Sequence, residues 1–168
     1  MKGHAVYICV GSNIGNKLEN CKKGVAALIR SGSVMLKAQS PCYKTDPVDY
    51  MDQDWFINYA IKIETSLNPF ELLNRLKSIQ QDAGRTNDII RFGPRILDMD
   101  IILFGNVVIK SKDLIIPHPR MHKRRFVLKP VCDIDADIVH PVFKKNMKYL
   151  LEHLNDGEQG IEEYKCDY

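Results

Sequence analysis

The apolar residues of this 168-residue chain change their period several times, and the order of those changes restricts the fold. Alternating runs rich in β-branched residues predict strands, and apolar residues three and four apart predict helices. The predicted strands span residues 4–10, 34–39, 55–64 and 96–104, and the predicted helices span residues 18–29 and 69–83. The order is therefore β-α-β-β-α-β.

This order is typical of an α+β domain with a ferredoxin-like core, a mostly antiparallel sheet with helices packed on it. Residues 40–54 mix prolines, aspartates and aromatic residues and are predicted to form a long loop. Additional C-terminal elements are expected, namely a short strand at 107–109, helices at 123–131 and 147–154, and a polar, frayed tail after residue 157. We expect a single domain over residues 1–168.

Composition excludes several classes of protein. The chain is 45% hydrophobic, and its five cysteines include no C-x-x-C pair, which argues against a disulfide framework and a zinc site. No secretory pattern stands at the N-terminus, and no apolar run approaches the roughly 20 residues that span a bilayer. We therefore expect a cytoplasmic protein, a monomer, without a membrane partner.

Positive charge is concentrated in one segment. The net charge of the chain is +3, but residues 85–129 carry +6 and the remainder carries −3. Such a segment fits an anionic partner that binds at one place, although a merely solvated face gives the same pattern.

Asp98 and Asp100 are the most informative pair of residues. They stand two apart in an otherwise apolar predicted strand, so both side chains leave the same face. Two carboxylates this close repel each other by about 3 kcal/mol at an effective dielectric constant near 20. A compensating cation is expected: either magnesium, which favours carboxylate oxygens, or simply the side chain of Arg91 or Arg95.

The polar loop before this strand holds Arg85, Arg91 and Arg95. Guanidinium groups match phosphate oxygens in a bidentate way, and arginines beside acids that hold magnesium are what a nucleoside-triphosphate site requires. The cluster therefore favours magnesium at Asp98 and Asp100.

Two other motifs are weaker. Residues 11–17 (GSNIGNK) follow a predicted strand but lack the spacing of a phosphate-binding loop, so a strand-to-helix turn with a capping role is favoured. His118 and His122 have the spacing of a helical metal pair. Pro117 and Pro119 make that region extended, so the two histidines need not share a face.

Several segments of the sequence resemble a known family. Residues 84–85 (GR) and 91–105 (RFGPRILDMDIILFG) closely resemble the signature of the 6-hydroxymethyl-7,8-dihydropterin pyrophosphokinases of folate biosynthesis. Further matches in the family's order are residues 11–15, 43–45, 56–58, 116–120 and 125–128. The likeness extends over nearly the whole chain.

The resemblance implies an ATP-dependent diphosphokinase, in which the pterin hydroxyl attacks the β-phosphorus of ATP and AMP is released. It implies two Mg²⁺ ions on Asp98 and Asp100, with Arg85 and Arg95 embracing the phosphates as catalytic residues. The residues that match the family's nucleotide site are Gln80, Arg95, Ile101, His118 and Arg124. Those that match its pterin pocket are Thr45, Val48, Phe56, Asn58 and Phe126.

Four residues depart from the family pattern. Gln80 replaces a common glutamate, Phe92 a tryptophan, Asn87 an arginine, and Asp46 a proline or another neutral residue. Two rival interpretations remain, an RNA-binding module and a kinase of the same kind acting on another hydroxylated heterocycle. The acids on the last core strand oppose RNA binding, because they would repel phosphates without a metal. We expect small-molecule substrates and no nucleic-acid partner.

Overall fold

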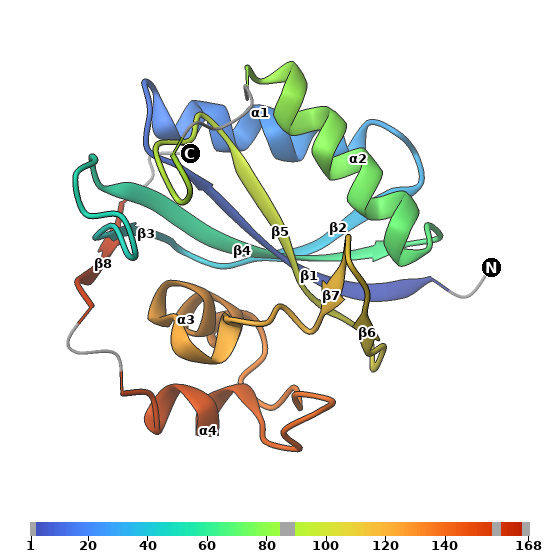
Figure 1. Cartoon of the computed structure of the whole chain (residues 1–168). Helices are drawn as coiled ribbons and strands as arrows, with labels where there is room; N and C mark the ends of the chain where they lie inside the picture. Colours follow the sequence, from blue (N-terminus) through green and yellow to red (C-terminus); the bar gives the residue numbers. More distant parts are fainter. Residues whose placement is uncertain (1–2, 85–89, 156–158, 166–168) are drawn as a thin grey trace.

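The computed structural model describes residues 3–84, 90–155 and 159–165. One sheet runs through its centre (Figure 1). The strands of this sheet are β1 (His4–Ser12), β2 (Val34–Gln39), β3 (Cys42–Thr45), β4 (Phe56–Thr65), β5 (Asp98–Phe104) and β8 (Ile161–Tyr164). Two further strands, β6 (Ile109–Lys110) and β7 (Ile115–Ile116), pair only with each other.

The strand order is β5-β1-β4-β3-β8, and β2 also pairs with β4. Every pairing in the sheet is antiparallel. Strands β1 and β4 are central, and the segments β1-α1-β2 and β4-α2-β5 form the two β-α-β crossovers. The predicted ferredoxin-like core is therefore confirmed.

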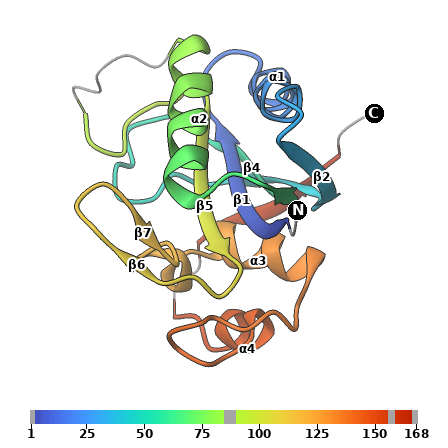
Figure 2. The ribbon, with the colours of Figure 1, turned by 90° about the vertical axis from the view of Figure 1, so that its right-hand side faces the viewer.

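Helices cover both faces of the sheet (Figure 2). Helices α1 (Lys17–Ile29) and α2 (Pro69–Asp82) lie on one face, and α3 (Arg125–Ile134) and α4 (Met147–Glu152) lie on the other. Alternation along the strands divides the core in the same way: Ile57, Tyr59 and Ile61 of β4 belong to the α1–α2 side, and Ala60 belongs to the α3 side. Among the described residues, no helix is long and apolar enough to cross a membrane.

Asparagine side chains cap the two core helices. The Oδ1 of Asn16 accepts a hydrogen bond from the backbone N–H of Glu19, so residues 11–17 form the expected strand-to-helix turn. Asn68 caps α2 in a reciprocal arrangement with Glu71, and Pro69 follows at the first helical position, as predicted.

Several predicted boundaries were wrong. The 40–54 loop begins with strand β3, and the tail expected to be frayed contains β8, which pairs with β3. Strand β5 begins at Asp98 rather than residue 96. The short strand expected at 107–109 lies at 109–110, and a 3₁₀ turn at Met121–Lys123 precedes α3, which therefore begins two residues later than predicted.

The buried ring of His140 predicts how the free energy of unfolding changes at acidic pH. The ring is buried, and its Nδ1 accepts hydrogen bonds from the backbone N–H groups of Val142 (3.2 Å) and Phe143 (3.1 Å). Burial, and then the nearby His122, lower the pKa of His140 from 6.5 to about 4. The unfolded chain therefore binds this proton at higher pH than the folded chain does, so the free energy of unfolding falls as the pH drops from 6.5 towards 4.

We expect His140 to account for a loss of about 2 kcal/mol in the free energy of unfolding between pH 7 and pH 5. Urea denaturation at both pH values measures it. The His140→Asn variant, whose amide oxygen can accept the same backbone hydrogen bonds without titrating, should lose less stability over this interval. An equal loss in both proteins would contradict the assignment.

Candidate functional site

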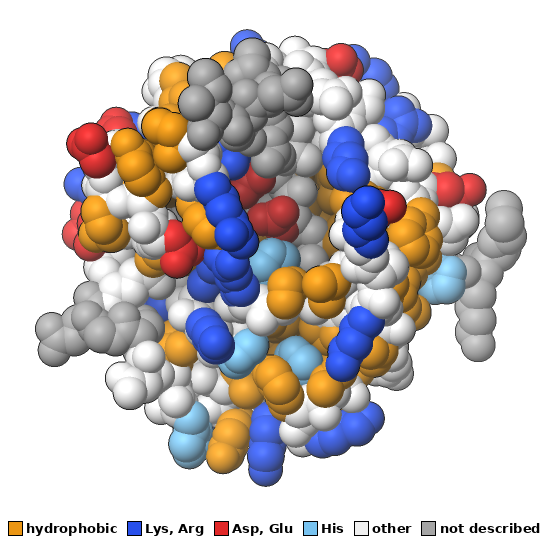
Figure 3. All heavy atoms as spheres, viewed as in Figure 1, with side chains coloured by type: hydrophobic (Ala, Val, Ile, Leu, Met, Phe, Trp, Pro, Cys, Tyr) orange, Lys and Arg blue, Asp and Glu red, His pale blue; other side chains and the backbone are white. Residues whose placement is uncertain are grey.

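A cavity of about 390 Å³ opens on the α3 side of the sheet. Residues of β1, β4 and β5 form its floor. Residues 45–53 and 91–95 form one part of its rim, and residues 118–127 form the wall opposite this rim. In Figure 3, acidic side chains lie inside a hollow that Lys and Arg side chains flank, with histidine at its lower edge. The cavity therefore combines an acidic floor with a basic surround.

The acidic floor follows from alternation along β5. Asp98 and Asp100 face the cavity, while Met99 and Ile101 between and beyond them are buried in the core on the α1–α2 side. Both aspartates are half-buried. The two carboxylates thus leave the strand on the same side, as their spacing predicts.

Cys9 lies on β1, next to the acids of β5. It is the antiparallel partner of Asp100, and its side chain also lines the cavity. Burial, and then the negative charges of Asp100 and Asp98, hold the pKa of the Cys9 thiol well above its ordinary value. The thiol is neutral at pH 7, so the negative charge of the floor belongs to the two aspartates.

The wall opposite the acids is basic. His118, Arg120 and Arg124 all line it. The backbone N–H of His118 donates to the carbonyl of Ile102 in β5 (3.0 Å), and its Nδ1 accepts from the backbone N–H of Arg120 (3.2 Å). Burial, followed by the charge of Arg124, lowers the pKa of His118 to about 4. The ring is therefore neutral at pH 7. Because its Nδ1 accepts a hydrogen bond, its one proton is on Nε2, which is the donor.

The far part of the cavity combines a buried polar pair with aromatic rings. Asn58 Nδ2 donates to Thr45 Oγ1 (2.8 Å), and both residues are buried. A Cβ atom at Gly11 would lie 2.3 Å from Asn58 Oδ1, so only glycine leaves room for this amide. Phe56 from β4 and Phe126 from α3 also line this cavity.

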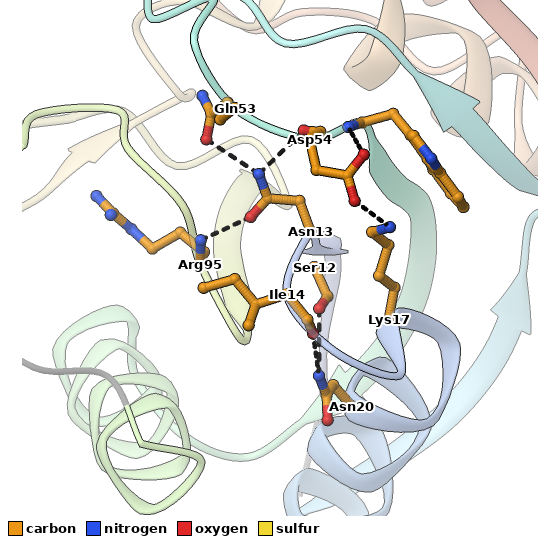
Figure 4. Close-up of polar contacts among 9 residues, drawn as sticks. Ser12, Asn13, Ile14, Lys17, Asn20, Gln53, Asp54 and Arg95 are labelled. Carbon is orange, nitrogen blue, oxygen red and sulfur yellow. Dashed lines mark hydrogen bonds and ion pairs between the residues drawn. The ribbon is translucent and has the colours of Figure 1, made fainter.

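Three segments around the cavity meet at the buried side chain of Asn13 (Figure 4). Its Nδ2 donates to Gln53 Oε1 (3.0 Å) and to the carbonyl of Asp54 (3.1 Å). Its Oδ1 accepts from the backbone N–H of Arg95 (2.7 Å), whose carbonyl in turn accepts from the N–H of Asn13 (3.0 Å). One amide therefore connects the end of β1 to the loop before β4 and to the loop before β5.

Phe92 links the arginines of the rim and the wall. It lies at φ 58°, and the Nε2 of Gln53 donates to its carbonyl oxygen (2.9 Å). The guanidinium groups of Arg91, Arg120 and Arg124 lie 4.8, 4.5 and 5.8 Å from the centre of its ring. These are cation–π distances, so the ring holds cations from two separate segments at the mouth of the cavity.

Most of the residues predicted for the site line this cavity. They are Thr45, Val48, Phe56, Asn58, Arg95, Asp98, Asp100, His118, Arg124 and Phe126. The two histidines do not share a face, because His122 packs edge-on against the ring of Phe143 instead.

Three predicted residues are placed differently. The Ile101 side chain lies in the core on the opposite face of the sheet, outside the cavity lining. Gln80 is buried where α2 meets β5: its Nε2 donates to the carbonyl of Leu76 (2.9 Å) and its Oε1 accepts from the N–H of Met99 (3.3 Å). Arg85 lies outside the described residues.

Sequence reasoning missed five residues of the site. Cys9, Asp49, Gln53 and Arg120 line the cavity, and Asn13 organises its loops. Arg120 lies inside a motif that had been recognised, so its position next to His118 was a usable signal. Asn13 likewise lies inside residues 11–15, another segment that matches the family. No sequence signal distinguishes Cys9, Asp49 and Gln53, because their contacts join segments about 40 or more residues apart.

The chain matches the family model described as 7,8-dihydro-6-hydroxymethylpterin-pyrophosphokinase (HPPK) over residues 7–136. The chain belongs to the HPPK family.

Two curated relatives and one solved structure illustrate this membership. A 2-amino-4-hydroxy-6-hydroxymethyldihydropteridine pyrophosphokinase of Bacillus subtilis is 47% identical over 128 residues, 76% of each chain. The folic acid synthesis protein fol1 of Pneumocystis carinii is 41% identical over 154 residues, which are 92% of this chain but only 20% of that protein. The crystal structure of wild-type HPPK-DHPS from Plasmodium falciparum shares the fold, with a TM-score of 0.70 at 14% identity, covering 90% of this chain and 44% of that one.

The structure shows the contacts of three of the four residues that depart from the HPPK pattern. Phe92 offers an aromatic face to three arginines, which a tryptophan would also do. The amide oxygen of Gln80 accepts a hydrogen bond from the backbone N–H of Met99. The backbone N–H of Asp46 donates to the carbonyl of Gly160 (3.0 Å), just before β8. The fourth departure, Asn87, lies outside the described residues.

Removing the Asn13 amide should loosen the loops of this HPPK domain. The Asn13→Ala variant leaves buried donors and acceptors unsatisfied, so we expect it to lose about 1–3 kcal/mol of unfolding free energy. We also expect faster cleavage by trypsin at Arg91 and Arg95. Asn20→Ala is a matched control, because the hydrogen bonds that the Asn20 side chain makes to described residues go to Ser12 and Ile14, close to it in the chain. Equal trypsin cleavage in the two variants would contradict the role of Asn13.

Proposed function

We propose that this chain transfers the terminal diphosphate of ATP to the hydroxymethyl group of 6-hydroxymethyl-7,8-dihydropterin and releases AMP. The observation that carries the proposal is one cavity with two carboxylates at its floor, arginines and a histidine around it, and a buried amide with two phenylalanines in its far part. Membership of the HPPK family supports it, as does the name of the Bacillus subtilis relative. The name of the Pneumocystis carinii relative supports a role in folate synthesis.

In this reaction the pterin hydroxyl oxygen forms a bond to the β-phosphorus of ATP. The bond from that phosphorus to the oxygen bridging the α-phosphorus breaks, AMP leaves with the oxygen, and the hydroxyl proton passes to solvent. A loose transition state places the main demand on positioning and on neutralising charge, and not on a strong base. The enzyme must therefore hold the two substrates in line.

The chemistry of Asp98 and Asp100 fits magnesium. Both supply hard carboxylate oxygens from one strand face, and the neighbouring Cys9 thiol is neutral. Among the described residues, no three His, Cys, Asp or Glu side chains gather into a closed metal site. Two carboxylates therefore leave coordination positions for water and for phosphate oxygens, as Mg²⁺ requires. When bound, two such ions would neutralise the transferring group.

The basic residues have separate tasks in the proposed reaction. Arg95 from the rim and Arg124 from the wall neutralise phosphate oxygens on opposite sides of the cavity. The same task is assigned to Arg85, which lies outside the described residues, from the family resemblance alone. Neutral His118 donates a hydrogen bond to the nucleotide and adds no charge. Gln80 and Ile101, whose side chains lie outside the cavity lining, act on the nucleotide through the strand β5 that they position.

The far part of the cavity fits a flat heterocycle. Asn58 both donates and accepts hydrogen bonds, which suits the polar edge of a pterin, and Thr45 orients this amide. Phe56 and Phe126 supply aromatic surface, and Val48 adds apolar contact. We also propose that the enzyme works as a cytoplasmic monomer on small molecules, with no nucleic-acid or membrane partner.

The decisive assay is release of AMP from ATP and Mg²⁺, with and without the pterin. We expect pterin-dependent AMP from the wild type and a loss of at least about 100-fold in Asp98→Asn, because the variant removes a metal-binding charge without changing shape. Asp113→Asn, an exposed acid outside the cavity, is the matched control and should retain full activity. ADP as the product would indicate transfer of the γ-phosphoryl group and overturn the proposal.

Gly11→Ala tests the pterin end separately. The added Cβ atom would meet Asn58 Oδ1 at 2.3 Å, so the amide must turn away from its place beside Thr45. We expect pterin affinity to fall by about 10-fold, the equivalent of one lost hydrogen bond, with ATP affinity unchanged. Fluorescence titration of each ligand measures both values, and Asn58→Ala should reproduce the effect. Unchanged pterin affinity in both variants would remove Asn58 from the pterin site.

A further inference from the structure

Asp49 has an unusual backbone conformation in the loop before β4. Its φ is 67°, in the left-handed region, and the N–H of Tyr50 donates across it to the carbonyl of Val48 (2.8 Å). A three-residue turn with positive φ at its centre is rare and strained, and glycine is the residue that adopts such φ values without cost. Aspartate and asparagine tolerate positive φ better than most residues, and the side chain of Asp49 also makes an interaction that holds it in this position.

That interaction is with two arginines of the opposite wall. Asp49 Oδ2 lies 3.3 Å from Arg124 Nη2 and 3.8 Å from Arg120 Nη1. The side chain of Arg124 is only 14% exposed, whereas that of Asp49 is 44% exposed. The arginine is thus largely buried in the wall, and the acid reaches it from a surface loop.

The two guanidinium groups are also held in place from another side. Both lie against the ring of Phe92, at 4.5 and 5.8 Å from its centre. Two preorganised guanidinium groups directed at one anionic oxygen form the arrangement that proteins use to bind phosphate. In this structure a carboxylate of the chain itself takes the anionic position.

We propose that Asp49 is an intramolecular competitor of the ATP phosphates for Arg120 and Arg124. Nucleotide binding displaces the carboxylate from the two guanidinium groups, so part of the binding free energy of the phosphates is spent on breaking this ion pair. This inference rests on the proposed function, because it takes ATP to be the ligand of the basic wall.

The test compares ATP affinity in Asp49→Asn with the wild type. Asparagine tolerates positive φ as well as aspartate does, so the variant removes the charge and keeps the turn. A partly exposed ion pair changes affinity by roughly two- to fivefold, so we expect tighter binding of MgATP by that factor at low ionic strength. The gain should shrink as NaCl is raised towards 1 M, where the screening length is about 3 Å.

The matched control is Asp52→Asn, which removes the same charge from an exposed position in the same loop, outside the cavity lining. Its MgATP affinity should equal that of the wild type, because Asp52 does not contact the two arginines. Inorganic triphosphate, which has no base or sugar, should show the same gain in Asp49→Asn if the competition is for phosphate.

The outcomes separate this inference from the proposed function. Equal MgATP affinity in wild type and Asp49→Asn, in a protein that still releases AMP in the presence of pterin, would overturn the competition and leave the function intact. An equal gain in Asp49→Asn and Asp52→Asn would also overturn it, as a general charge effect. Failure of all three proteins to bind MgATP would instead remove the proposed function.

Discussion

The arrangement of the cavity depends on one buried amide, that of Asn13. It donates twice and accepts once, and its partners belong to segments that are far apart in the chain. No other side chain of this size does both, because aspartate has no donor and serine has a shorter reach. The loop that contains Arg95 and the loop that contains Gln53 and Asp54 are thereby fixed relative to β1, and β1 is in turn paired with the strand that carries the acids.

Charges of opposite sign are carried by different kinds of structure. The acids stand on a central sheet strand, where backbone pairing holds their separation constant. The cations stand on loops and at the start of α3, and three of them lie against the ring of Phe92. Carboxylates at a constant separation and cations that are held from more than one side are both features of a preorganised site.

The core and the acid pair could be predicted because they depend on local periodicity. Alternation along β4 and β5 determines which side chains meet, and Asp98 and Asp100 need no distant partner to share a face. Strands β3 and β8 could not be predicted in this way. Each is four residues long, and half of its residues are polar or charged. Strand β3 pairs with β4 on one side, and on the other side it pairs with β8 across more than 100 residues of sequence. The placement of Gln80 and the contact of Asp49 with Arg124 likewise arise only when distant segments pack.

The long strand β4 has two different neighbours along the same edge. Residues 61–65 pair with β2 and residues 56–58 pair with β3, and between them the N–H of Ala60 donates to the hydroxyl of Ser40 (2.9 Å). At the end of β4 that pairs with β3, Phe56 and Asn58 line the cavity while Ile57 between them is buried in the core. Because side chains alternate along a strand, a substitution at a cavity-facing position leaves the core-facing side chains of the same strand in place.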